Sequence, residues 1–160
     1  MKKKIILKLS LLALLFLPLS CGFKVLNKSN AYNYSIKEII TSGNKRISYK
    51  IKNNLLANSK ENSPNELIIY VKAEKSQDIK EKNIKNEITK YQVNLNVEIS
   101  YNILSNLNKT QKINFSISGD YNVEDFHSDT INNEKNLLNN LIENIAEKIA
   151  NQIGTKMNDL

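Results

Sequence analysis

The side chains that could support acid–base or metal chemistry gather in one short stretch, residues 124–129 (EDFHSD). The only histidine, His127, lies there between Asp125 and Asp129, and such groups can serve as a general base, a metal ligand or a carboxylate pair for glycoside hydrolysis. Each of these chemistries needs further converging groups, and the sequence offers no second histidine, nucleophilic cysteine or ordered triad. We therefore favour a loop histidine ahead of a helix, with Asp129 or Thr130 capping that helix and Asp125 in solvent. No catalytic residue and no metal ligand is predicted.

The composition excludes several classes of protein. One cysteine and one histidine rule out a disulfide framework and a zinc site of Cys and His ligands, and four scattered glycines cannot form a glycine-rich phosphate loop, so no cofactor is expected. The net charge is +7, but four of the lysines lie in the first 20 residues. If that segment is removed, the remaining net charge is +3. The charge then gives little reason to expect a nucleic-acid partner.

The first 20 residues are typical of a secretory signal peptide. A cationic start precedes the apolar run of residues 9–17 (LSLLALLFL), which is too short for a transmembrane helix of about 20 residues. The run ends in Leu17-Pro18-Leu19-Ser20-Cys21, which resembles a bacterial lipobox, in which the cysteine is acylated. We therefore predict a lipoprotein signal peptide over residues 1–20 and lipidation of Cys21. The alternative is an ordinary signal peptide followed by a free cysteine.

Periodicity predicts six elements after a polar tether, residues 21–33. Strands are expected over residues 34–41, 66–75, 91–103 and 113–121, and helices over residues 45–58 and 129–157. The clearest strand alternates seven apolar residues, from Tyr91 to Ile103, with polar ones, and it forms a long hairpin with the strand that follows. In the first helix, Ile47, Ile51 and Leu55 recur every fourth residue and so share one face.

The order β-α-β-β-β-α predicts one α+β domain over residues 34–160. We expect a two-layer sandwich in which a four-stranded, mostly antiparallel sheet carries two helices on its apolar face. The other sheet face would then be bare, and it is rich in Asn, Ser and Gln with little charge. On the sequence alone we favour a solvated face. The alternative is a contact surface for a polar but mostly uncharged partner.

The lysines outside the signal peptide fall into two groups. Lys80, Lys82 and Lys85 have glutamates nearby, so we interpret them as part of a solvated loop of mixed charge. Lys109 and Lys112 lie at the tip of the long hairpin, where a basic side chain can reach an anionic ligand. The alternative for this second group is that the charges only aid solubility.

Several short motifs resemble the LPS-assembly lipoprotein family LptE, also called RlpB, and its alphaproteobacterial form in particular. Many members begin the mature chain Cys-Gly-Phe-Arg/Lys-Pro-Leu-Tyr, and residues 21–24 and Leu26 match this pattern, whereas Val25 and Asn27 depart from it. Lys90-Tyr91 resembles the basic-Tyr start of the family's long strand. Residues 118–122 (SGDYN) resemble the close of the next strand. The likeness covers nearly the whole mature chain.

This resemblance implies a function. Family members are not enzymes: they plug the lumen of the outer-membrane β-barrel LptD, assist its assembly and help to deliver lipopolysaccharide to the outer leaflet. Gly22 stands where lipoproteins retained in the inner membrane typically carry Asp, which implies an outer-membrane, periplasm-facing location. Lipopolysaccharide carries phosphates, and we expect Lys90, Lys109 and Lys112 to face it, although the family does not fix these positions. The alternative is an independent periplasm-facing lipoprotein, acting as a small binding module or a hydrolase.

Overall fold

The computed structural model describes residues 32–158, apart from the side chains of residues 106–109. The predicted signal peptide, Cys21 and most of the predicted tether therefore lie outside the described residues. The elements are β1 (Ser35–Gly43), α2 (Lys45–Asn58), β2 (Glu66–Lys82), β3 (Ile88–Ile103), β4 (Asn106–Asn122) and α3 (His127–Asn158).

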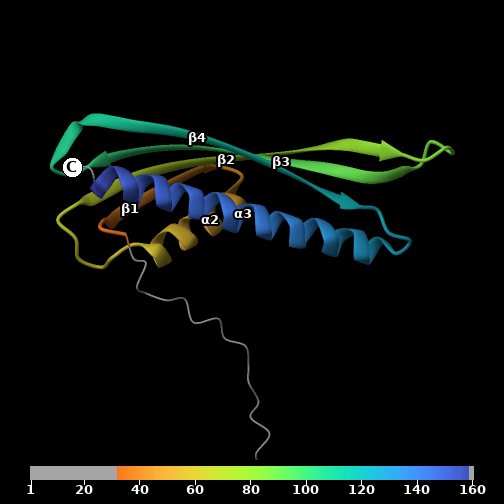
Figure 1. Ribbon diagram of the computed structural model, residues 1–160, viewed down its shortest axis with the longest axis horizontal. Coiled ribbons are helices and arrows are strands. Elements are labelled where there is room, and N and C mark those ends of the chain that lie inside the picture. Colours follow the sequence, from red (N-terminus) through yellow and green to blue (C-terminus); the bar gives the residue numbers. More distant parts are fainter. Residues whose placement is uncertain (1–31, 159–160) are drawn as a thin grey trace, which may run out of the picture.

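The four strands form one sheet in the order β1-β2-β3-β4. β1 and β2 are parallel, with Ile39 opposite Ile69, because α2 carries the chain back between them. β2, β3 and β4 follow as an antiparallel meander, and both helices lie on the same side of the sheet (Figure 1). The predicted two-layer α+β sandwich is thus confirmed.

The core lies between the sheet and the two helices. Alternate residues of each strand point to it, as Val93, Leu95 and Val97 do on β3, and all three are buried. α2 contributes Ile47, Ile51 and Leu55, as the four-residue spacing predicted. α3 contributes a longer stripe, namely Leu141, Ile142, Ile145, Ala146, Ile149, Ala150, Ile153 and Met157. Each large aliphatic side chain buried in this way stabilises the fold by about 1.5–3 kcal/mol.

The second strand is longer than predicted, and the interpretation of Lys80, Lys82 and Lys85 as loop residues is wrong for the first two. β2 continues to Lys82, which pairs with Ile88, so the β2–β3 hairpin extends past the end of the helix layer (Figure 1). Lys85 alone lies in the turn. There the Asn83 side-chain oxygen accepts hydrogen bonds from the backbone N–H groups of Lys85 (2.9 Å) and Glu87 (3.0 Å).

The start of α3 also differs from the prediction. The helix begins at His127, so Asp129 lies inside its first turn and does not cap it. Thr130 instead fastens the helix to the preceding segment, because its hydroxyl accepts a hydrogen bond from the backbone N–H of Glu124 at 2.8 Å. Ile131, which has the helical spacing of the core residues, is 49% exposed because this end of α3 runs beyond the packed core.

A close turn joins β1 to α2. Gly43 has a φ of +75°, and a Cβ there would overlap the carbonyl of Ala73, so the position requires glycine. Asn44 then caps α2: its side chain accepts from the N–H of Ile47 at 3.2 Å, and its own N–H bonds to Ala73 at 2.7 Å. The buried hydroxyl of Ser48 donates to the carbonyl of Ser42 at 2.7 Å. These bonds fix where α2 starts below the sheet.

Tyr32, which the sequence places in the tether, packs onto the folded domain. Its ring stacks on Tyr34 with 6.0 Å between the centroids, and its hydroxyl bonds to Asn151 of α3. A Cβ at Gly154 would overlap the Tyr32 ring, so the ring can pack here only because position 154 of the helix has no side chain. The described chain therefore begins at a fixed point against α3.

A double-mutant cycle tests this contact. Ala is normally favoured over Gly in a helix by about 1 kcal/mol. We expect Gly154→Ala to give no such gain in the unmodified chain, because it displaces Tyr32, and to raise the free energy of unfolding by about 0.5–1 kcal/mol in a Tyr32→Ala background. Urea unfolding followed by circular dichroism measures both. An equal gain in the two backgrounds would show that Tyr32 does not rest on Gly154.

Candidate functional site

The sheet face opposite the helices is uncovered within the described residues and carries polar side chains in a regular pattern. Its centre is a band of uncharged side chains, aligned across three strands by the strand register. The band consists of Ser76 on β2, Asn94 and Asn96 on β3, and Ser116 and Ser118 on β4. All five are exposed or half-buried. The band presents hydrogen-bond donors and acceptors without charge.

Charged residues flank this band, and most of them are paired with one another. Lys72 bonds to Glu74 at 2.9 Å and lies 3.8 Å from Glu98, and the hydrogen bond with Glu74 is the largest cause of the raised pKa of Lys72. Towards the β2–β3 hairpin, Lys80 pairs with Asp120 and so lowers the pKa of that carboxyl. The face is therefore more charged than predicted, but its charges largely cancel.

A shallow hollow of about 180 Å³ lies on the same face, at the other end of the sheet. Tyr70, Lys72, Ser100 and Lys112 are among its lining residues. Tyr70 is 44% exposed, and its partner in the strand register, Ile40, is 41% exposed, so an exposed apolar pair begins at the edge of the hollow with Tyr70. Lys112 makes no hydrogen bond or ion pair within the part of the chain that the structure describes. The hollow thus combines an unpaired cation with an exposed aromatic ring.

The structure does not bring the three predicted ligand-facing lysines into one site. Lys112 lies opposite Ser100, whereas Lys90 lies ten positions further along β3, about 33 Å away at 3.3 Å per residue. Lys90 is also bound to Glu81 at 2.8 Å. The side chain of Lys109 lies outside the described atoms. Any role of these three residues toward a ligand stays a prediction.

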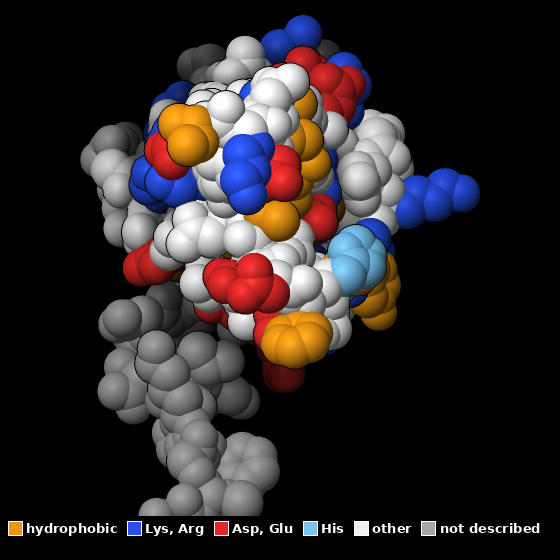
Figure 2. Space-filling view, turned by 90° about the vertical axis from the view of Figure 1, so that its right-hand side faces the viewer, with side chains coloured by type: hydrophobic (Ala, Val, Ile, Leu, Met, Phe, Trp, Pro, Cys, Tyr) orange, Lys and Arg blue, Asp and Glu red, His pale blue; other side chains and the backbone are white. Residues whose placement is uncertain are grey.

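Asp125, His127 and Asp129 do not converge on a pocket. All three side chains are exposed. In Figure 2 the histidine lies at the surface, at an end of the molecule where basic, acidic and hydrophobic side chains are intermixed. Among residues 32–158, no three His, Cys, Asp or Glu side chains lie together in a way that could hold a metal ion. The described atoms thus assemble no acid–base constellation around His127.

Sequence reasoning missed the apolar border of the hollow. The signal was present, because residues 67–71 (LIIYV) are apolar without interruption, which placed Ile68 and Tyr70 on the face opposite the core. Such a run is typical of a strand that is covered on both faces. In the structure Ile68 is only half-buried and Tyr70 is partly exposed, with no second layer over them among the described residues.

The ion pair between Lys80 and Asp120 predicts a titration shift. Because Lys80 holds the pKa of Asp120 below its ordinary value, the pair contributes stability above the pKa of an unfolded Asp, about 3.9, and this is lost as the pH falls through the lower folded pKa. Lys80→Gln should raise the pKa of Asp120 towards 3.9, measured by NMR titration of its carboxyl carbon. Lys82→Gln on the same strand is the control and should leave it unchanged. An unshifted titration in the Lys80 variant would contradict the pairing.

Several solved structures share this architecture. No protein-family model matches the sequence, and no curated protein matches it either. The rare lipoprotein B of Shewanella oneidensis is similar in structure, with a TM-score of 0.58 and 12% identity over 76% of this chain and 97% of that chain. A minor lipoprotein of Acinetobacter baumannii gives a TM-score of 0.57 and 14% identity over 79% and 93% of the two chains. Lipoprotein B of Nitrosomonas europaea gives 0.56 and 14% over 79% and 85%. This chain therefore has the fold of the rare lipoprotein B structures.

Proposed function

We propose that this chain is a lipoprotein of the LptE (RlpB) family that plugs an LptD-type outer-membrane β-barrel and helps to assemble it for lipopolysaccharide transport. The fold supports the proposal, because the likeness to the rare lipoprotein B of Shewanella oneidensis extends over 97% of that chain. The sequence motifs around Cys21, Lys90 and residues 118–122 point to the same family. The proposed role is structural and involves no enzymatic step.

The observation that carries the proposal is the open face of the sheet. The lumen of an outer-membrane barrel is polar, so a plug needs a surface that exchanges hydrogen bonds without burying unpaired charge. The uncharged band, with Asn94 and Asn96 at its centre and paired charges on either side, meets that need. β2 and β4 have 17 residues each and so are about 55 Å long. This exceeds the roughly 30 Å of a bilayer's hydrocarbon core, so the open face is long enough to extend along the lumen of a barrel that spans the bilayer.

The proposed anchor is the acylated Cys21. Each buried methylene of an acyl chain contributes about 0.8 kcal/mol, and two or more chains hold a protein stably on a membrane. Neither helix among the described residues is long and apolar enough to cross a bilayer. The eleven residue steps from Cys21 to Tyr32, which is fixed against α3, could span at most about 40 Å. The anchor would thus hold this end of the domain close to the outer membrane, facing the periplasm.

Lipopolysaccharide is the proposed cargo, and its phosphates would pair with basic side chains. Of the predicted lysines, Lys112 is the better placed, because it borders the hollow near Tyr70 without a partner among the described residues. Lys90 would have to leave Glu81 before it could bind a phosphate. The proposal therefore assigns the first contact to the Lys112 end of the sheet.

Site-specific photo-crosslinking tests the plug. We expect a photoreactive residue at Ser116, on the open face, to form an adduct with a large β-barrel in outer membranes, because that face would line the lumen wall. The matched position is Asn140, which is exposed on α3, and it should react much less. Mass spectrometry identifies the adduct. Crosslinking from Asn140 but not from Ser116, or recovery of the free chain alone, would contradict the plug and favour an independent lipoprotein.

Replacement of the cysteine tests the anchor separately. Cys21→Ala should move the protein from the outer-membrane fraction to the soluble periplasmic fraction, because no acyl chain can be attached. Fractionation and immunoblotting measure the change, and intact-mass analysis of the unmodified chain should find the added acyl groups. A Cys21→Ala variant that fractionates like the unmodified protein would show that Cys21 is not the anchor.

A further inference from the structure

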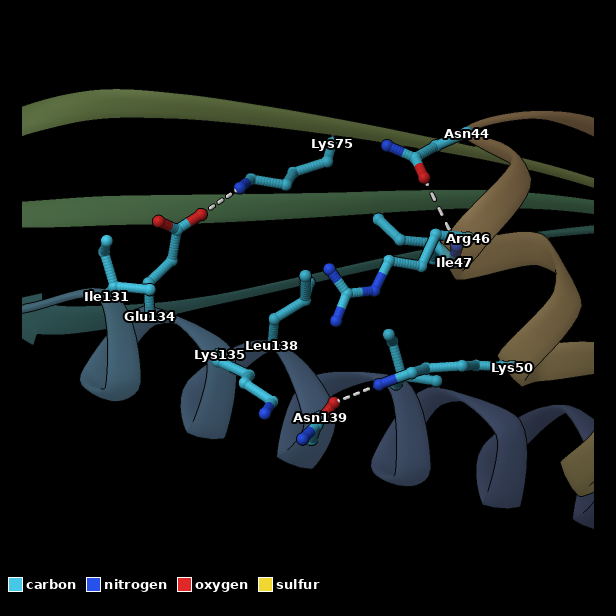
Figure 3. Close-up of a pocket in the computed structure, with 11 residues that line it drawn as sticks. Asn44, Arg46, Ile47, Lys50, Lys75, Ile131, Glu134, Lys135, Leu138 and Asn139 are labelled. Carbon is cyan, nitrogen blue, oxygen red and sulfur yellow. Dashed lines mark hydrogen bonds and ion pairs between the residues drawn. The ribbon is translucent and has the colours of Figure 1, made fainter. Parts of the chain in front are cut away.

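A groove of about 260 Å³ lies in the helix layer, on the side of the sheet opposite the proposed barrel contact. It is bounded by the start of α2, the first half of α3 and the core-side face of β2 (Figure 3). Arg46, Lys50 and Lys75 contribute cations from α2 and β2, and Lys135 contributes one from α3. The three elements are distant in sequence, so the fold itself gathers these charges.

The groove is strongly unbalanced in charge. Its lining residues include four cations and a single carboxylate, Glu134, which pairs with Lys75. Lys50 bonds to the amide oxygen of Asn139, a neutral partner. Arg46 and Lys135 make no hydrogen bond or ion pair among the described residues. Two cations are thus held in position by their partners, and two are free to bind a ligand.

The start of α2 adds to the positive potential. A helix N-terminus carries a partial positive charge and normally attracts Asp or Glu to its first turn. The first turn of α2 contains no acidic residue and instead begins with Lys45 and Arg46. A cation at this end of a helix is unfavourable for folding, because it faces the partial positive charge of the helix N-terminus. Local rules are broken in this way mainly at functional sites.

The floor of the groove is apolar. Ile47 and Ile142 are buried beneath it, Leu138 is half-buried, and Ile131 is 49% exposed at its edge. In Figure 3, Arg46 extends from α2 into the space between α2 and α3. Cationic groups over an apolar floor suit a molecule that joins an anionic group to a hydrophobic part.

We infer that this groove binds a phosphate group, with Arg46 and Lys135 as its free ligands. The planar guanidinium of Arg46 can donate two parallel hydrogen bonds to phosphate oxygens, and Lys135 supplies a second charge from the facing helix. Lys50, oriented by the neutral Asn139, adds to the positive field, whereas the charge of Lys75 is offset by Glu134. The phosphate can come from a lipid headgroup, whose acyl part would rest on Leu138 and Ile131, or from a free phosphate ion.

Binding can be measured by NMR on the full-length chain in a nonionic maltoside detergent, with backbone amides as reporters. The probes are inorganic phosphate and dihexanoyl phosphatidic acid below its micelle concentration, and dihexanoyl phosphatidylcholine is the zwitterionic control. We expect saturable shifts at the amides of residues 45–47 and 135–139 with either phosphate probe. Binding at least about tenfold tighter to the lipid assigns a lipid headgroup, and equal binding assigns free phosphate.

A double variant and a matched control distinguish a specific phosphate site from the general attraction of anions to a basic protein. Arg46→Gln with Lys135→Gln should weaken binding at least about tenfold and leave the spectrum of the rest of the domain unchanged, because both side chains are exposed and have no partner among the described residues. Lys148→Gln is the matched control: it is exposed on the same helix, thirteen positions and so about 20 Å further along. Shifts that fail to saturate, or equal weakening in the Lys148 variant, would overturn the phosphate site.

Discussion

The packing of α3 along the apolar face of the sheet is the contact on which the rest of the molecule depends. Ile142, Ile145, Ile149 and Ile153 are each at most 1% exposed, and together they cover a sheet whose own core residues come from all four strands. Gly119 of β4 allows the close approach, because a Cβ there would lie 2.6 Å from a methyl carbon of Leu137. A sheet that buries one face in this way has the other face free for function.

The regular spacing of apolar residues along the chain explains why most of the fold could be predicted. β3 repeats its apolar residues with a period of two from Tyr91 to Ile103, and α2 with a period of four from Ile47 to Leu55. Each repeat leaves one choice of element and of buried face. The far half of β2 carries no such signal. Residues 76–82 (SQDIKEK) contain a single apolar residue, and they are a strand because β3 and the Asn83 turn supply their hydrogen-bond partners. The strand conformation of residues 76–82 depends on pairing with β3, and no local pattern in the sequence indicates that pairing.

The candidate sites show the same division between local and tertiary information. The uncharged band was visible in the sequence because it is the polar half of the β3 and β4 alternation. The ion pairs beside it were not, since Lys80 and Asp120 meet only through the strand register, 40 residues apart in the chain. Lys75 gave a signal that could have been used. It continues the alternation of Leu67, Ile69, Val71 and Ala73, so a charged side chain had to point to the helix side.

The two faces of the domain therefore offer two kinds of chemistry at once. The open face has cancelled charges and an uncharged centre, which suits a large polar surface that must be held without a high desolvation cost. The helix side keeps unpaired cations at the α2–α3 groove, which suits a small anion of high charge density. Because one sheet separates them, a phosphate in the groove does not compete with a partner on the open face. A bound phosphate would also relieve the repulsion between Arg46, Lys135 and the N-terminus of α2, and so tighten the helix pair that holds the sheet from behind.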